Sequence, residues 1–173
     1  MTSKKFNDTI IKNLYSNDEN LVLKAIDDLS ENGNSDYIPA LIDLLNTHDS
    51  DAIKIHITKI LSELKHTNAV PLLVQAIEDN KLVKLRETLV RVCWENGLDY
   101  SNYFTTFVNL LINGDYMVAF EAYTVIDSSE GSISKVSSQQ YIEQLKEALP
   151  SVGEERQTLI HHIIQFLPGL VRA

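Results

Sequence analysis

The chain has 173 residues, 44% of them hydrophobic, and its 24 acidic residues outnumber its 15 basic ones to leave a formal net charge of −9 at pH 7. This hydrophobic fraction is too high for a disordered chain, and the sequence contains no run of about 18 apolar residues that would span a membrane. The acidic balance argues against nucleic-acid binding and against docking on an anionic membrane, because both need clustered Lys and Arg.

Apolar residues recur at helical spacing along the chain, after a terminal helix that we expect over residues 3–16. Stripes of two kinds then alternate. Those of the first kind are Leu21, Ala25, Ile26 and Leu29; Ile53, Ile57, Ile60, Leu61 and Leu64; Leu85, Leu89, Val92 and Cys93; and Val118, Ala122, Val125 and Ile126. Those of the second kind are Tyr37, Ile38, Leu41, Leu44 and Leu45; Val70, Leu73, Ala76 and Ile77; Phe104, Phe107, Val108 and Leu111; and Tyr141, Ile142, Leu145, Ala148 and Leu149. A last helix is expected over residues 154–167. No stretch alternates with the two-residue period of a strand, so the sequence predicts an all-α chain.

Residues that start and stop helices fall between these stripes. Asp36 and Asn68 stand just before stripes of the second kind, where a helix N-cap is wanted. Pro39 and Pro71 follow in the first turn, where a missing N–H costs little. Gly97 comes after the third stripe of the first kind, as a helix stop does.

The stripes repeat at a fixed interval in the first half of the chain. A step of 32 residues carries Leu21 to Ile53 and then to Leu85, and the same step carries Pro39 to Pro71. We divide the chain into units of about 18–48, 49–79, 80–114 and 115–150, the last with a Ser-rich insert at 128–134. Units of two helices at a fixed period predict a solenoid, in which each unit buries its apolar faces against its neighbours. We expect residues 1–173 to form a single such domain.

The repeats resemble those of a known family. The segment Ala69-Val70-Pro71-Leu72-Leu73 and its second copy Tyr37-Ile38-Pro39-Ala40-Leu41 are similar to one helix of the short bacterial HEAT repeat. Ile53-Lys54 and Leu85-Arg86 resemble the Val-Arg start of the other helix. The resemblance implies an armadillo-like α–α superhelix of about four helical hairpins with an extra helix at each end. It also implies a scaffold that binds other proteins, although a minority of the family are enzymes, including DNA-alkylation repair glycosylases and bilin lyase subunits.

Polar residues on the helices of the second kind form the first candidate site. In such solenoids we expect these helices to line the inner curve, so their outward positions would form a groove. The unit step aligns acidic and amide residues in rows along it: Asp43, Asn46, Gln75, Glu78, Asp79, Asn109, Asn113, Glu143 and Glu147. These rows are either a solvated face or a surface for a protein or peptide that is basic at the contact.

Aromatic residues gather in the third unit and at the start of the fourth. We expect Phe104, Phe107 and Phe120 to enlarge the local core. Trp94, Tyr100 and Tyr116 fit either a core position or a surface contact, since exposed Trp and Tyr are typical anchors of interfaces.

Residue patterns that carry catalysis are scarce. Cys93 lies on an apolar stripe and is expected to be buried, and as the only cysteine it has no internal disulfide partner, which favours a reducing cytoplasm. The histidines lack metal-ligand spacing, and no glycine-rich phosphate loop occurs, so we expect no metal and no cofactor.

These observations favour a non-catalytic binding scaffold. The alternatives are an enzyme or enzyme subunit of the DNA-repair or bilin-lyase type, for which Trp94 and Asp99 are the one pair to consider, and an immunity-type inhibitor of a basic partner. The apolar last helix, with Leu159, Ile160 and Ile163, also suggests a homodimer through this helix.

Overall fold

The computed structural model describes residues 8–31 and 35–171, and this part of the chain is all-α as predicted. The helices are α1 (Asp8–Leu14), α2 (Glu19–Glu31), α3 (Ile38–Thr47), α4 (Asp51–Ser62), α5 (Ala69–Glu78), α6 (Arg86–Asn96), α7 (Phe104–Asn113), α8 (Tyr116–Asp127), α9 (Lys135–Ala148) and α10 (Glu154–Phe166). Short 3₁₀ turns join them: η1 (Ser35–Tyr37), η2 (Asn80–Leu85), η3 (Ser101–Tyr103), η4 (Leu149–Ser151) and η5 (Leu167–Leu170). Residues 3–7 of the expected first helix lie outside the described residues.

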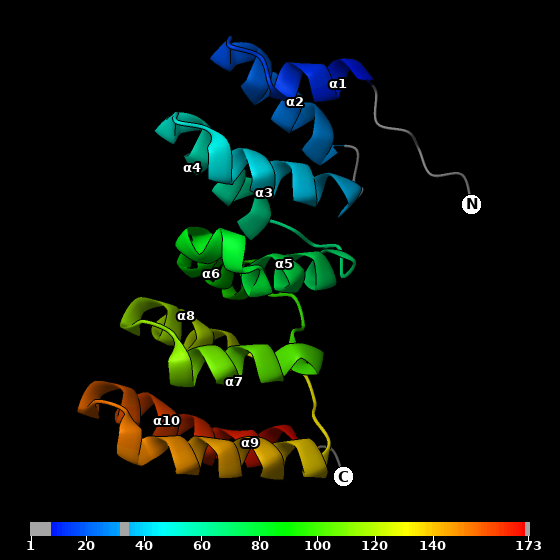
Figure 1. Ribbon diagram of the computed structural model, residues 1–173. Helices are drawn as coiled ribbons and strands as arrows, with labels where there is room; N and C mark the ends of the chain where they lie inside the picture. Colours follow the sequence, from blue (N-terminus) through cyan, green and yellow to red (C-terminus); the bar gives the residue numbers. More distant parts are fainter. Residues whose placement is uncertain (1–7, 32–34, 172–173) are drawn as a thin grey trace.

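The helices form hairpins that stack one on another (Figure 1). Each odd-numbered helix packs against the even-numbered helix that follows it, so α1 pairs with α2 and α9 with α10. The proposed units instead joined α2 to α3 and α4 to α5. The sequence shows the period of the repeat, but the start of each unit depends on which helices pack together. In this pairing α1 and α10 are each half of a hairpin and do not stand alone.

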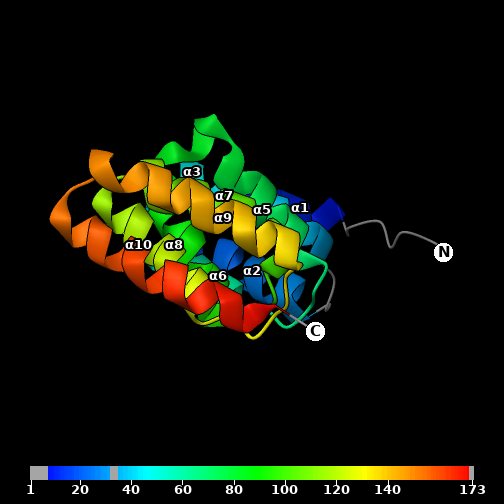
Figure 2. The same cartoon turned by 90° about the horizontal axis from the view of Figure 1, so that it is seen from below.

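The stack has two faces, formed by α1, α3, α5, α7 and α9 (the odd-helix face) and by α2, α4, α6, α8 and α10 (the even-helix face) (Figure 2). Along the even-helix face every helix packs on the next. On the odd-helix face, by contrast, α5 and α7 share little contact. The helices of the acidic and amide rows are those of the odd-helix face. That they line an inner curve stays a prediction.

Helix ends follow the predicted signals in part. Pro71 lies in the first turn of α5, and Gly97 ends α6 in the left-handed conformation, with φ 67°. Asn68 precedes α5, but its side chain makes no capping hydrogen bond. Side-chain caps occur at other helices: Asp115, which stands ahead of its apolar stripe in the sequence, accepts the Val118 N–H at 2.9 Å, and Ser134 accepts the Ser137 N–H at 3.0 Å.

The core runs between the two faces and is made mostly of the predicted stripes. Ile53, Ile57 and Leu61 of α4 are fully buried, and so are the large rings of Phe104 and Phe107. This continuous burial is what holds the hairpins in register.

Two residues expected in the core are exposed instead. Leu21 is 41% exposed because Val22, one position further round the helix, faces the core. Phe120 is also 41% exposed, because the small residues Ala119 and Ala122 occupy the core-facing positions of α8.

The last helix leaves little apolar surface for a second copy. Ile160 and Ile163 of α10 are fully buried, as is Leu167 just beyond it. These side chains already pack inside the protein, which removes the reason for predicting a homodimer through this helix. None of the helices in the described ranges is long and apolar enough to cross a membrane.

Replacement of Gly131 by alanine is expected to lower the free energy of unfolding by about 1–3 kcal/mol, because the added methyl group would overpack the site. A Cβ there would lie against Asp99 Oδ1 and 2.7 Å from Ser101 Oγ. Asp99 Oδ1 also accepts the Ser101 N–H at 2.9 Å, so the new methyl group would disturb this turn.

Thermal unfolding followed by circular dichroism measures the effect. Gly169→Ala is the matched control, because no atom lies within 4 Å of its added Cβ and stability should stay equal or rise slightly. Equal melting temperatures for the two variants would contradict the close approach of the segments around Asp99 and Gly131.

Candidate functional site

A groove on the odd-helix face brings four of the predicted binding residues together. Asp43 and Asn46 come from α3, Gln75 comes from α5, and Asp79 follows at the end of α5; they line a hollow of ≈ 450 Å³. The aliphatic side chains of Ile42, Leu72 and Ala76 also line it, as do Lys81 and Leu82 of η2. We call this hollow the α3–α5 groove.

The two carboxylates of the groove are held by local hydrogen bonds. Asp43 Oδ2 accepts the Tyr15 hydroxyl at 3.1 Å, which ties the turn after α1 to α3. Burial and then the bond to Asp43 raise the pKa of Tyr15 above its usual value, so the phenol stays a donor at neutral pH. Asp79 Oδ1 accepts the Lys81 N–H at 2.8 Å, which orients the carboxylate at the start of η2. Each carboxylate can accept further bonds, since it has about four acceptor positions.

Other residues of the predicted rows serve contacts between helices. Glu78 Oε1 accepts the Thr106 hydroxyl at 2.5 Å, linking α5 to α7, and Asn109 Oδ1 accepts the Gln144 amide at 2.7 Å, linking α7 to α9. The Asn113 amide donates to the Asn109 carbonyl within α7. Equivalent positions in the repeat therefore have different roles. Some row residues line the α3–α5 groove, whereas Glu78 and Asn109 bond to the helix of the next hairpin.

The remaining row residues lie on α9. Glu143 Oε1 accepts the Gln139 amide at 3.0 Å from the preceding turn, and Glu147 is exposed near the end of the helix. Neither lines the α3–α5 groove, so the structure does not join the predicted rows into one continuous site.

Comparison with known families decides the identity of this fold. The family model for HEAT repeats matches residues 7–92, which include both helices of the groove and all of η2. The chain belongs to the HEAT-repeat family. No curated protein is a significant match to the sequence. HEAT-repeat proteins are commonly scaffolds for protein interactions and are generally non-catalytic.

The aromatic candidates of this HEAT-repeat protein fall in three different environments. Tyr100 is 2% exposed, packs edge-on to Phe107 with ring centroids 5.7 Å apart, and hydrogen-bonds Asn96. Of the two alternatives for Tyr100, the structure shows the core position and not the surface contact. Tyr116 is 43% exposed and lines a separate hollow of ≈ 690 Å³ with Asn113 and Arg156.

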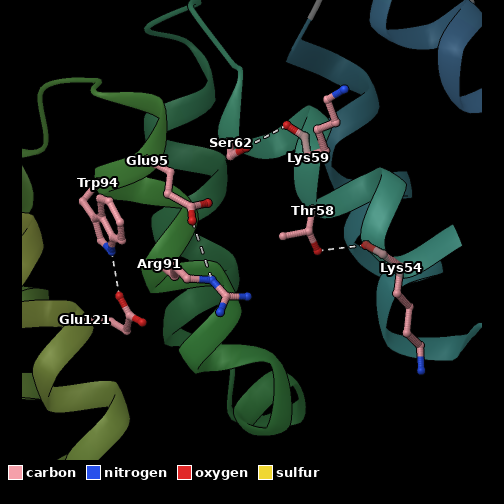
Figure 3. Close-up of polar contacts among 8 residues, drawn as sticks. All are labelled: Lys54, Thr58, Lys59, Ser62, Arg91, Trp94, Glu95 and Glu121. Atoms are coloured by element: carbon pink, nitrogen blue, oxygen red, sulfur yellow. Dashed lines mark hydrogen bonds and ion pairs between the residues drawn. The ribbon is translucent and has the colours of Figure 1, made fainter. Parts of the chain in front are cut away.

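Trp94 lies on the even-helix face and reaches toward α8. Its indole N–H donates to Glu121 Oε2 at 2.6 Å, and the two side chains point toward each other across the α6–α8 seam (Figure 3). Trp94 remains 37% exposed, whereas Glu121 is 6% exposed. This buried carboxylate was missed in the sequence, although a signal was present. Glu121 stands three residues after Val118 and four before Val125, a polar residue on an apolar stripe.

A line of rings continues from α8 to α10. Phe120 and Tyr123 have ring centroids 6.2 Å apart, and Tyr123 meets His162 edge-on at 5.6 Å. His162 Nε2 also bonds Asp127 Oδ1 at 2.8 Å and stacks on Phe166. These contacts join neighbouring hairpins on the even-helix face.

Groups that could perform chemistry are few in the described part of the chain. Cys93 is fully buried as predicted, and burial raises the pKa of its thiol to about 12, so it is no thiolate at neutral pH. No group of three or more His, Cys, Asp or Glu side chains in residues 8–31 and 35–171 could hold a metal ion. Asp99 lines a hollow of ≈ 440 Å³ together with Trp94 and Cys93, but its carboxylate orients the turn to Ser101.

Proposed function

We propose that this chain is a binding scaffold that holds a protein or peptide partner in the α3–α5 groove, and that the partner is basic at the contact. The observation that carries the proposal is the meeting of Asp43, Asn46, Gln75 and Asp79, from two successive hairpins, around one hollow. Membership of the HEAT-repeat family supports the general role as an interaction scaffold.

The chemistry of the groove supports a peptide segment as the occupant. Its aliphatic lining can cover the stem of a long side chain, and the carboxylates of Asp43 and Asp79 can pair with a Lys or Arg head. The amides of Asn46 and Gln75 both donate and accept, as a peptide main chain requires. The net charge of −9 favours approach of a basic partner, raising the rate of association more than the final affinity.

The double variant Asp43→Asn/Asp79→Asn is expected to weaken binding of the partner by about three- to ten-fold at physiological salt, since exposed ion pairs contribute modestly. Asparagine keeps the oxygen that accepts the Tyr15 hydroxyl and the Lys81 N–H, so the fold should be retained. The measurement is a quantitative pull-down from an extract of the source cells, followed by titration of the retained protein at low and high salt.

The matched control is Glu31→Gln/Glu63→Gln, which removes the same charge from exposed residues at the C-terminal ends of α2 and α4, outside the groove. Neutralising an acid at a helix C-terminus costs no stability. A partner lost equally from both double variants would show that only net charge matters. A partner retained by both, with no salt dependence, would contradict the groove as the binding site.

A further inference from the structure

The second surface of interest is the α6–α8 seam on the even-helix face, where Glu121 is nearly buried. Within the described residues, Glu121 forms no ion pair with Lys, Arg or His. The Glu121 carboxylate accepts a hydrogen bond from a neutral donor, the Trp94 indole N–H, at 2.6 Å. Arg91, one turn away from Trp94 on α6, pairs with Glu95 at 3.9 Å instead (Figure 3).

A buried carboxylate loses its hydration, and it normally regains that free energy by pairing with a cation or by accepting several hydrogen bonds. One neutral N–H fills only part of the acceptor capacity of Glu121. No buried side-chain oxygen of the described residues lacks a hydrogen-bond partner, so the second oxygen of Glu121 keeps some contact with solvent, from which a stronger donor can reach it. A largely buried side chain with one accessible oxygen distinguishes this seam from the exposed acids of the α3–α5 groove.

Exposed apolar side chains lie on both helices of this seam. Trp94 of α6, which contacts the carboxylate, is 37% exposed, and Met117, one turn before Glu121 on α8, is 47% exposed. Because the indole N–H is occupied by Glu121, the exposed part of Trp94 is its aromatic ring. A cation over such a ring gains about 0.5–2 kcal/mol, more when the site is desolvated.

We propose that Trp94 and Glu121 form a receptor for the arginine side chain of a partner protein. The guanidinium stacks on the ring of Trp94 and donates to the Glu121 carboxylate, two contacts that its planar fork makes at once. Charge complementarity with an acidic chain favours this occupant, and the compact ammonium of lysine, which cannot stack, is expected to bind more weakly. This receptor lies on the opposite face from the α3–α5 groove and does not depend on it.

The single tryptophan of the chain makes the test direct, because all indole fluorescence comes from Trp94. The probe is a tri-arginine peptide amide, compared with tri-lysine and tri-glycine amides at low ionic strength. We expect a saturable change of Trp94 emission with tri-arginine, a weaker response to tri-lysine and none to tri-glycine. Glu121→Gln, which keeps an acceptor oxygen but removes the charge, is expected to weaken tri-arginine binding by about ten-fold.

Three controls distinguish this receptor from a nonspecific effect of charge. Glu31→Gln removes the same charge at a distant exposed site and should bind as the wild type does. The groove variant Asp43→Asn/Asp79→Asn should also respond normally, so failure of the proposed function and failure of this receptor are distinguishable. The indole N–H resonance of Trp94 in the wild-type protein should shift with tri-arginine but not with an equal ionic strength of sodium chloride, a readout that needs no variant.

Two results would overturn the proposal. One is tri-arginine binding that is equal in the wild type and in Glu121→Gln. The other is no change of Trp94 fluorescence or of the indole resonance when tri-arginine is added to the wild-type protein, together with a Glu121→Gln variant that only has a lower melting temperature. In that case the Trp94–Glu121 bond only joins α6 to α8, as the His162–Asp127 bond joins α10 to α8.

Discussion

Replacement of Phe107 by alanine is expected to lower the free energy of unfolding by about 3–5 kcal/mol, the usual cost of removing a fully buried aromatic ring. Phe107 is 0% exposed on α7 and packs edge-on to Tyr100 at an interplanar angle of 84°. Truncation leaves a cavity and also removes the aromatic pair, which itself contributes about 0.5–1.5 kcal/mol. For a chain of this size the melting temperature should fall by roughly 10 °C.

The chain provides a control with the same chemistry. Phe120→Ala removes an identical side chain from the surface of α8, where it is 41% exposed, and should cost about 1 kcal/mol or less. Thermal and urea unfolding of both variants give the comparison. If the two substitutions lower the free energy of unfolding equally, α7 does not pack in the core as described.

Replacement of Arg156 by methionine is expected to lower the free energy of unfolding by about 2–3 kcal/mol. The guanidinium donates from Nη1 to the Ile112 carbonyl and from Nη2 to the Gly114 carbonyl, both at 2.7 Å. These carbonyls belong to the end of α7, where helix geometry leaves acceptors without partners. Arg156 thereby connects the start of α10 to the preceding hairpin, and methionine keeps the apolar stem while removing both bonds.

Arg156→Lys tests the geometry of this contact. Lysine keeps the charge but carries no planar fork, so its stability should fall between those of the wild type and the methionine variant. The measurement is again urea unfolding with circular dichroism. A lysine variant as stable as the wild type would show that charge near the end of α7 matters and that the two-carbonyl geometry does not.

Both proposed binding surfaces lie where neighbouring hairpins meet. The α3–α5 groove lies between the second and third hairpins, and the Trp94–Glu121 receptor lies between the third and fourth. In a stacked array each hairpin contacts only its neighbours, so a change in one contact reshapes the adjacent seam first. The α3–α5 groove is remote from α10, so variants such as Arg156→Met are expected to retain binding in this groove.

The candidate site was predictable from the sequence only to the extent that it follows the repeat. The step of 32 residues aligned Asp43 with Gln75, and the structure brings this pair to one groove. The repeat also placed Glu78, by the step of 32, and Asn109, by a step of 34, on the outward surface. Their bonds to Thr106 and Gln144 join residues 28 and 35 positions apart, and such contacts depend on how far each helix is rotated against the next.

By itself, the sequence determined that this chain is a stack of helices with buried stripes, because periodic apolar residues can be buried only on one face of a helix and against a neighbouring unit. The tertiary structure decided which helices pair and which polar residues are used for contacts between hairpins. Those properties arise from the packing of side chains such as Val22 and Ala119 across seams. A residue's place in the repeat says which way it points from its own helix, but what it meets there depends on the neighbouring hairpin.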